Sequence, residues 1–109
     1  MSGLYDNLKR TVEDLAASAD KQEAMLRKAR VGPDELALDF DAFAAAALNL
    51  VESGELSPDA HEAIRALDAH LVAFGGAHNA EEWTEAALYH STNWATAREL
   101  ASKVLTLMG

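Results

Sequence analysis

The chain has 109 residues, of which half are hydrophobic and a quarter charged, and this predicts one soluble globular domain over 1–109. Cysteine is absent, which excludes disulfides, a thiol nucleophile and thiolate metal ligands, and the longest apolar run, 42–48, is too short for a membrane span. The formal net charge is −9, and residues 32–109 carry thirteen acidic against three basic residues, so we expect no nucleic acid ligand and a basic protein partner instead.

The first predicted element is one long amphipathic helix over 3–29, the longest of the chain. Its apolar face recurs at alternating intervals of three and four, at Tyr5, Leu8, Val12, Leu15, Ala19, Gln22, Leu26 and Ala29. A second interpretation breaks this helix at 18–20, because Asp20 and Glu23 also resemble a capping signal. We favour the continuous helix, which ends before Gly32 and Pro33.

The same face raises the question of self-association. A polar residue such as Gln22 on a helix seam often sets the register between paired helices. If the rest of the fold leaves this face uncovered, we expect a homodimer through Tyr5, Leu8, Val12 and Leu15.

Two further helices are predicted in the middle of the chain. One covers about 34–53, with Asp39 and Asp41 near its start, where the helix dipole favours acidic side chains. These acids are either caps or part of an acidic binding face. The next helix has the clearest start in the chain, with Ser57 as N-cap and Pro58 in the first turn, and it ends at 75–76.

The last third of the chain predicts a fourth helix and a fifth. Asn79 and Glu82 match a capping box for a helix that runs to Tyr89 or His90. The fifth helix covers about 92–108. Since no strand-like alternation is present, the sequence predicts an all-α fold, an up-and-down bundle of four to five helices with short loops.

The four histidines do not form a metal motif. His61, His70, His78 and His90 lack the spacing of known zinc and di-iron helical sites. No serine lies at a recognisable nucleophile turn. We therefore expect no catalytic residue, no cofactor and no bound metal.

The aromatic residues allow two interpretations. Trp83 and Trp94 lie eleven residues apart, and both are expected to anchor the core. Alternatively one of them is partly exposed, and Trp94 then forms an interaction site with Tyr89 and Arg98, because these residue types dominate binding energies at interfaces.

Residues 82–88, EWTEAAL, are followed by Trp94, by Ala97 and Arg98, and by Leu100 and Ala101. Together they resemble a group of small, alanine-rich helical bacterial proteins of unknown function. The resemblance covers the last third of the chain, implies a helical fold, and brings no catalytic residues.

Three functions are compatible with these features. The leading hypothesis is a non-enzymatic, acidic protein–protein interaction module, immunity- or antitoxin-like, in the cytoplasm, where a cysteine-free chain without a signal-peptide pattern is expected. The second is a small-molecule or metal-binding bundle with a pocket near Trp83, His90 and Trp94. The third is a structural homo-oligomer formed through the first helix.

Overall fold

A computed structural model describes residues 3–75 and 77–108, and every regular element in them is helical. The elements are α1 (Gly3–Ala16), α2 (Ala19–Ala29), α3 (Asp34–Ala44), α4 (Ala47–Glu52), α5 (Pro58–Ala73), the 3₁₀-helix η1 (Ala77–Trp83), α6 (Glu85–His90) and α7 (Thr92–Met108). The predicted all-α class is confirmed. The predicted number of four to five helices is not, because the expected helices over 3–29 and 34–53 are each divided into two. None of the helices described here combines the length and apolarity needed to cross a membrane.

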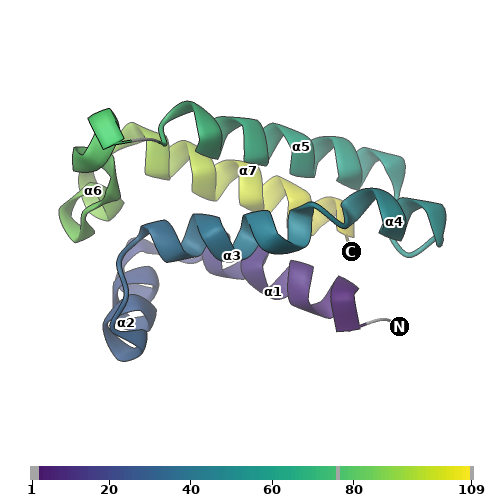
Figure 1. The fold of residues 1–109 in the computed structure, drawn as a ribbon, viewed down its shortest axis with the longest axis horizontal. Coiled ribbons are helices and arrows are strands. Elements are labelled where there is room, and N and C mark those ends of the chain that lie inside the picture. Colours follow the sequence, from purple (N-terminus) through teal and green to yellow (C-terminus); the bar gives the residue numbers. More distant parts are fainter. Residues whose placement is uncertain (1–2, 76, 109) are drawn as a thin grey trace.

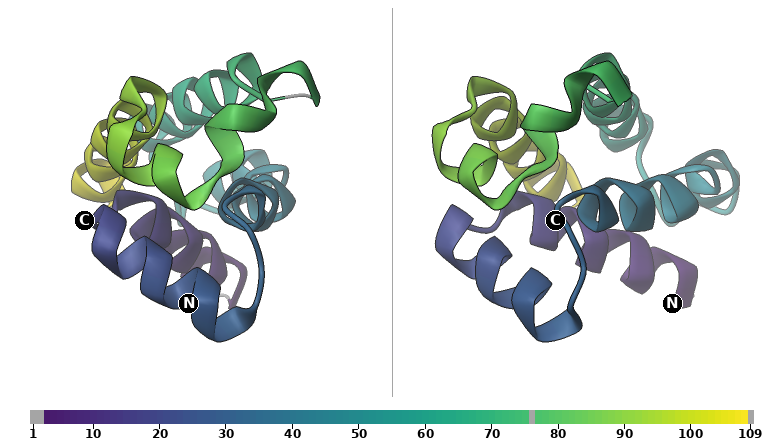
Figure 2. Two further views of the ribbon diagram at one scale, coloured as in Figure 1. Left: turned by 90° about the vertical axis from the view of Figure 1, so that its left-hand side faces the viewer. Right: turned by 60° about the vertical axis from the view of Figure 1, so that its left-hand side comes forward.

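Four helices, α1, α3, α5 and α7, form the body of the molecule and run in alternating directions (Figure 1). The helices α2 and α6 and the η1 segment gather at one end of this body. Seen from that end, α7 lies between α1 and α5, and α3 lies between the same two helices on the other side (Figure 2). Each of the four helices therefore has two neighbours and one face turned to the centre.

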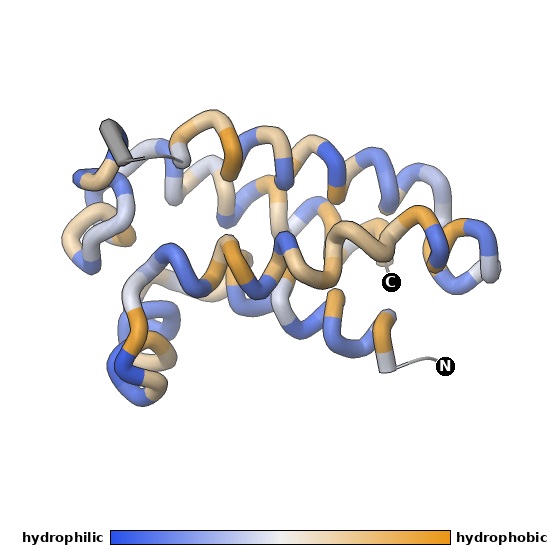
Figure 3. The backbone as a smooth tube through the Cα atoms, in the orientation of Figure 1, coloured by the Kyte–Doolittle hydropathy of each residue, from blue (hydrophilic) through white to orange (hydrophobic). Residues whose placement is uncertain are grey.

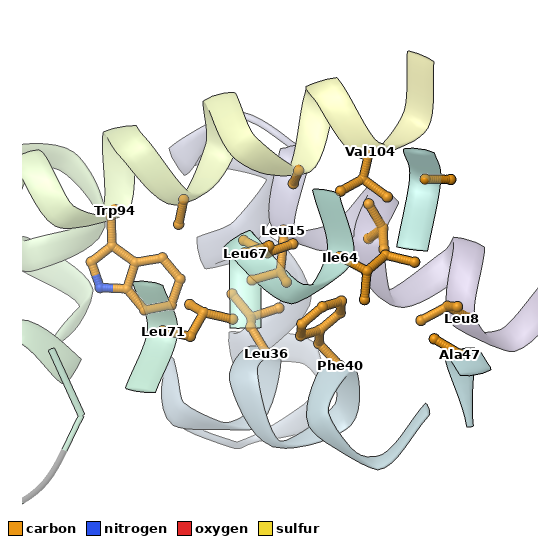
Figure 4. Packing of buried hydrophobic residues seen from close by; sticks show 14 of the residues in the cluster. Leu8, Leu15, Leu36, Phe40, Ala47, Ile64, Leu67, Leu71, Trp94 and Val104 are labelled. Carbon is orange, nitrogen blue, oxygen red and sulfur yellow. The ribbon is translucent and has the colours of Figure 1, made fainter. Parts of the chain in front are cut away.

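The core fills the centre of this body. Hydrophobic positions alternate with hydrophilic ones along each of the four helices (Figure 3), as expected for elements that bury one face. The fully buried side chains come from all four helices and include Leu8, Leu15, Phe40, Ile64, Leu67, Trp94 and Val104 (Figure 4). Buried alanines at 60, 97 and 101 allow α5, α7 and α1 to approach closely, because a methyl group keeps the helix surfaces smooth.

The predicted continuous first helix is wrong, since α1 ends at Ala16 and α2 begins at Ala19. Ser18 has extended backbone angles, φ −61° and ψ 157°, and its hydroxyl caps α2 by accepting a hydrogen bond from the backbone N–H of Lys21. With α1 at 14 residues and α7 at 17, the first helix is not the longest. The break at 18–20 given by the alternative interpretation therefore forms, but its cap is Ser18 and not the predicted signal of Asp20 and Glu23.

Gln22 explains why the chain turns back at this point. Its Nε2 atom donates to the carbonyls of Asp14 and Leu15, each at 3.1 Å, which are among the last carbonyls of α1 and have no partner inside that helix. Its Oε1 atom accepts from Arg98 Nη1 of α7 at 3.0 Å. Gln22 is fully buried, so it joins three helices of one molecule and does not set a register between two molecules.

The apolar face of α1 is covered within the same molecule. Leu8, Val12 and Leu15 are fully buried, and the partly buried Tyr5 donates its hydroxyl to the carbonyl of Met108 at 2.9 Å. Because α3 and α7 pack against this face, the predicted homodimer through these four residues lacks the uncovered stripe on which it depends.

Other helix ends differ in how well the sequence predicts them. The Ser57 cap is confirmed, since its hydroxyl accepts from the N–H of Ala60 at 3.1 Å. The capping box at Asn79 is wrong, because the Asn79 amide donates to the carbonyl of Gly75 at 3.0 Å and the surrounding residues form a 3₁₀-helix. Thr84 caps α6 in its place.

Candidate protein-binding groove

The predicted aromatic interaction site does not form, because Trp94 is completely buried. Its indole Nε1 donates to the carbonyl of Glu82 at 2.6 Å, which satisfies the only polar atom of the ring. Trp94 therefore anchors the core, as the first interpretation predicts, and is not available to a partner.

Tyr89 and Arg98 are both occupied in holding α2 against the rest of the molecule. The exposed Tyr89 hydroxyl donates to Asp20 Oδ1 at 2.9 Å, and this hydrogen bond is the main cause that raises the pKa of Tyr89 to about 12. Arg98 donates to Gln22, and burial lowers the pKa of its guanidinium. The two residues thus stabilise the junction between α2, α6 and α7.

The second tryptophan has a different environment. Trp83 stacks on Phe74 with a centroid separation of 4.9 Å and meets the edge of Trp94 at 5.4 Å. Its Nε1 donates to the carbonyl of Phe74 at 3.0 Å, which closes η1 back on the end of α5. Trp83 is only partly buried, so one part of its ring remains accessible.

The pocket expected near Trp83, His90 and Trp94 is not formed by these three residues. Trp94 has no exposed surface to offer a ligand, and His90 lies exposed at the end of α6. The side chain of His78 lies outside the described part of the chain. Among the described residues, no group of three or more His, Cys, Asp or Glu side chains is placed to hold a metal ion.

A hollow in the described part of the molecule lies between α3 and α5, and we call it the α3–α5 groove. It encloses about 410 Å³. Its lining residues are Asp34, Ala37, Leu38 and Asp41 from α3, Asp68, Leu71 and Val72 from α5, and Gly75 and Trp83 from the segment that follows.

The groove follows from the spacing of its lining residues along the two helices. The four residues of α3 are spaced i, i+3, i+4 and i+7, and Asp68, Leu71 and Val72 of α5 are spaced i, i+3 and i+4, so each set lies on one face of its helix. On α3 the two middle positions are apolar and the two outer positions are aspartates. Since seven helical residues rise about 10 Å, these aspartates mark the two ends of a short apolar channel.

The rim of the groove exposes two large hydrophobic side chains. Val72 is 70% and Leu38 is 57% exposed, the highest values among the large hydrophobic residues described. Leu71, the neighbour of Val72 on α5, also lines the groove but is almost fully buried and belongs to the core (Figure 4). Water therefore contacts an apolar surface continuous with the core.

Gly75 keeps one end of this surface open. A Cβ atom at Gly75 would lie 3.3 Å from the carbonyl oxygen of Leu71 and 3.9 Å from Cζ2 of Trp83. Because glycine places no side chain there, the ring of Trp83 remains part of the groove lining.

The opposite end of the groove carries two neighbouring carboxyl groups, on Asp41 and Asp68. The pKa of Asp68 is raised, first by burial and then by the charge of Asp41 and a hydrogen bond with it. The described residues form two ion pairs, in which Arg27 contacts Glu23 and Glu85. No aspartate of the groove takes part in either pair.

The structure separates the two acids that the sequence pairs. Asp41 lines the groove, whereas Asp39 lies exposed on another side of α3. The pKa of Asp14 in α1 is raised mainly by burial, and the charge of Asp39 adds to this effect. Both lie in the middle of α3 and not at its start, because the helix already begins at Asp34. Of the predicted interaction residues, Asp41 alone belongs to the groove.

Leu38, Asp68 and Val72 are not among the predicted site residues. One sequence signal could have identified Val72: it is an apolar residue that directly follows Leu71, a member of the buried face of its helix, but does not belong to that face. A solvent-facing valine flanked four residues earlier by an aspartate indicates a second, smaller apolar face.

The chain matches no family model, and neither a curated protein nor a solved structure is found to match it. The resemblance of residues 82–88 and the following helix to alanine-rich bacterial proteins therefore stays a prediction. The function is inferred from the protein's own side chains and surfaces.

Proposed function

We propose that this protein is a non-enzymatic interaction module that binds a basic partner protein in the α3–α5 groove. The observation that carries the proposal is the juxtaposition, in one groove, of the two most exposed large hydrophobic side chains and three aspartates at its ends. We interpret α1, α3, α5 and α7 as an up-and-down bundle that serves as its scaffold.

The apolar rim supplies a reason for binding. Fully burying a side chain of the size of Val72 or Leu38 stabilises a complex by roughly 1.5–3 kcal/mol. Apolar surface that is contiguous and rimmed by polar groups is typical of interaction sites. A partner that covers both side chains gains affinity without any rearrangement of the core beneath them.

The charge of the groove supplies a reason for selectivity. A partner with Lys or Arg beside its apolar residues complements Asp34, Asp41 and Asp68, whereas an acidic partner is repelled. Residues 32–109, which include α3 and α5, carry thirteen acidic against three basic residues, so the same preference extends beyond the groove. An immunity- or antitoxin-like role against a basic toxin fits these properties.

A small molecule is the second candidate occupant of the groove. The volume of about 410 Å³ lies within the range of small-ligand pockets, and the partly exposed Trp83 offers an aromatic surface for stacking. The aspartates would then favour a cationic, largely apolar compound.

Selection from a random peptide library displayed on phage tests the protein-binding proposal. We expect peptides selected on the wild-type protein to combine Lys or Arg with large apolar residues, and to bind the Leu38→Ser, Val72→Ser double variant at least about ten-fold more weakly. The matched control is Leu48→Ser, because Leu48 on α4 is 53% exposed and does not line the groove. Selected peptides that bind the double variant as well as the wild type would overturn the proposal.

A further inference from the structure

The α3–α5 groove has the shape that two helices present to a third. Its walls are antiparallel, and both supply side chains from one helical face, with Leu71 as the floor between them. The side chains of one helix pack into the spaces between rows of side chains on another, at an axial separation of about 8–10 Å. A helix laid along this groove contacts α3 and α5 at once.

Resting on the function proposed above, we infer that the occupant of the α3–α5 groove is an amphipathic α-helix of the partner, with two cationic side chains seven residues apart that flank its apolar residues. This pattern is the complement of Asp34, Ala37, Leu38 and Asp41 on α3.

The spacing of the cations follows from the spacing of the aspartates. Asp34 lies at the end of the groove where α3 begins and α5 ends, and Asp41 lies with Asp68 at the other end. An occupant helix aligned with α3 has the same rise of about 1.5 Å per residue, so its own positions i and i+7 reach both ends. Cations placed four residues apart reach only one end.

A helix suits this groove better than an extended peptide. All regular elements in the described residues are helical, so an incoming strand finds no sheet edge with which to pair its backbone. Its N–H and C=O groups would lie unpaired against Leu71 and Val72, which costs free energy. A helix satisfies its backbone internally and presents only side chains.

The residues of the groove also determine how the occupant is held. The exposed Leu38 and Val72 cover the apolar side chains of the occupant helix. Because Gly75 has no side chain, one apolar side chain of the occupant can contact the ring of Trp83. Trp83 is therefore the tryptophan whose fluorescence reports occupation, because Trp94 is completely buried.

Three labelled synthetic peptides of about 16 residues, long enough to form a helix on binding, test this inference. The first has an alanine- and glutamine-rich background with Lys, Leu, Leu and Lys at i, i+3, i+4 and i+7. The second peptide has the same amino-acid composition, but its two lysines lie four positions apart instead of seven. The third is the first peptide with a central proline, which prevents a continuous helix.

We expect the first peptide to bind at least about ten-fold more tightly than the other two in fluorescence anisotropy, which corresponds to about 1.4 kcal/mol. Its binding should change the emission of the wild-type protein, and Trp83→Phe should remove this change while anisotropy still reports binding. Asp34→Asn and Asp68→Asn should each weaken binding. Asp39→Asn, which removes an exposed charge from α3 outside the groove, is the matched control and should leave binding unchanged.

Several results would overturn the inference. Equal affinity for all three peptides, with binding still lost in Val72→Ser, rejects the helical occupant but leaves the groove as a binding site for basic proteins. Failure of the first peptide to bind also rejects the helical occupant, and the phage selection then decides the proposed function separately. A wild-type dimer in sedimentation that Leu38→Ser and Val72→Ser dissociate assigns the groove to a second copy of the chain and contradicts both proposals.

Discussion

At the scale of single residues, side chains that are neighbours in the sequence have different surroundings, because they point in different directions from the helix axis. Asp39 and Asp41 lie two residues apart on α3, yet only Asp41 reaches the groove. Leu71 and Val72 are adjacent on α5, yet one is 5% and the other 70% exposed. A helix turns about 100° per residue, so adjacent side chains face different surroundings.

The carboxyl pair predicts a pH-dependent gain in stability for Asp68→Asn. The folded protein raises the pKa of Asp68 above its ordinary value of 3.8, so the ionised carboxylate destabilises the fold at neutral pH. Removing its charge should stabilise the protein at pH 7, by less than about 1 kcal/mol because the site is largely solvated. As pH falls through the raised pKa towards 3.8, the wild type binds the proton and the difference should disappear.

Urea unfolding of both proteins between neutral pH and about pH 4 measures this difference. Glu62→Gln, at an exposed position on the same helix beyond its first turn, controls for the loss of one negative charge. A variant no more stable than the wild type at neutral pH would show that neither burial nor the charge of Asp41 makes the ionised carboxylate of Asp68 unfavourable in solution.

At the scale of helices, polar side chains fasten α2 to the body. Tyr89 of α6 reaches Asp20, and Arg27 donates to Glu85 of α6 at 3.0 Å. These interactions are exposed, so each contributes little to stability. Gln22 is different, because its amide is buried and joins α1, α2 and α7.

Gln22→Ala should therefore destabilise the protein by about 1–3 kcal/mol. The substitution leaves the carbonyls of Asp14 and Leu15, and the guanidinium of Arg98, without their buried partner. Thermal unfolding followed by circular dichroism measures the effect. Lys21→Ala, at the exposed neighbouring position on α2, is the control and should change stability by less than about 0.5 kcal/mol. Equal stability of the two variants would mean that Gln22 does not hold the junction.

At the scale of the whole molecule, the core is shared by four helices, and the apolar face of α1 predicted to form a dimer is covered within the molecule. Leu8, Val12 and Leu15 contribute to that core with no exposed surface. The α3–α5 groove, which we propose as the partner-binding surface, is lined by residues of α3, α5 and the segment that follows α5, and by none of α1.

Leu8→Glu should accordingly unfold the protein rather than dissociate a dimer. The change places a charge with no partner in the core, which costs about 4 kcal/mol or more, a large part of the stability of a small domain. Circular dichroism should show loss of helix and of cooperative melting. Leu48→Glu introduces the same charge at a leucine that is 53% exposed and should stay folded. A folded, monomeric Leu8→Glu variant of a dimeric wild type would restore the dimer hypothesis.

The amino-acid sequence by itself determines the helical class, the start of α5 at Ser57 and the buried stripe that includes Ile64 and Leu67. These features depend on local interactions, namely backbone propensity, a side-chain cap within three residues and the 3.6-residue period. The core position of Trp94 is also predictable, since a large aromatic side chain gains most from burial.

Tertiary structure alone decides which of two acceptable local arrangements forms. At Ser18 a continuous helix and a capped break are both compatible with the local sequence, and Gln22 favours the break through partners in α1 and α7. Likewise, no local pattern states whether Leu38 and Val72 meet a neighbouring helix or water. The groove exists because the separation of α3 and α5 depends on how both helices pack against the rest of the core, and that is a property of the assembled molecule.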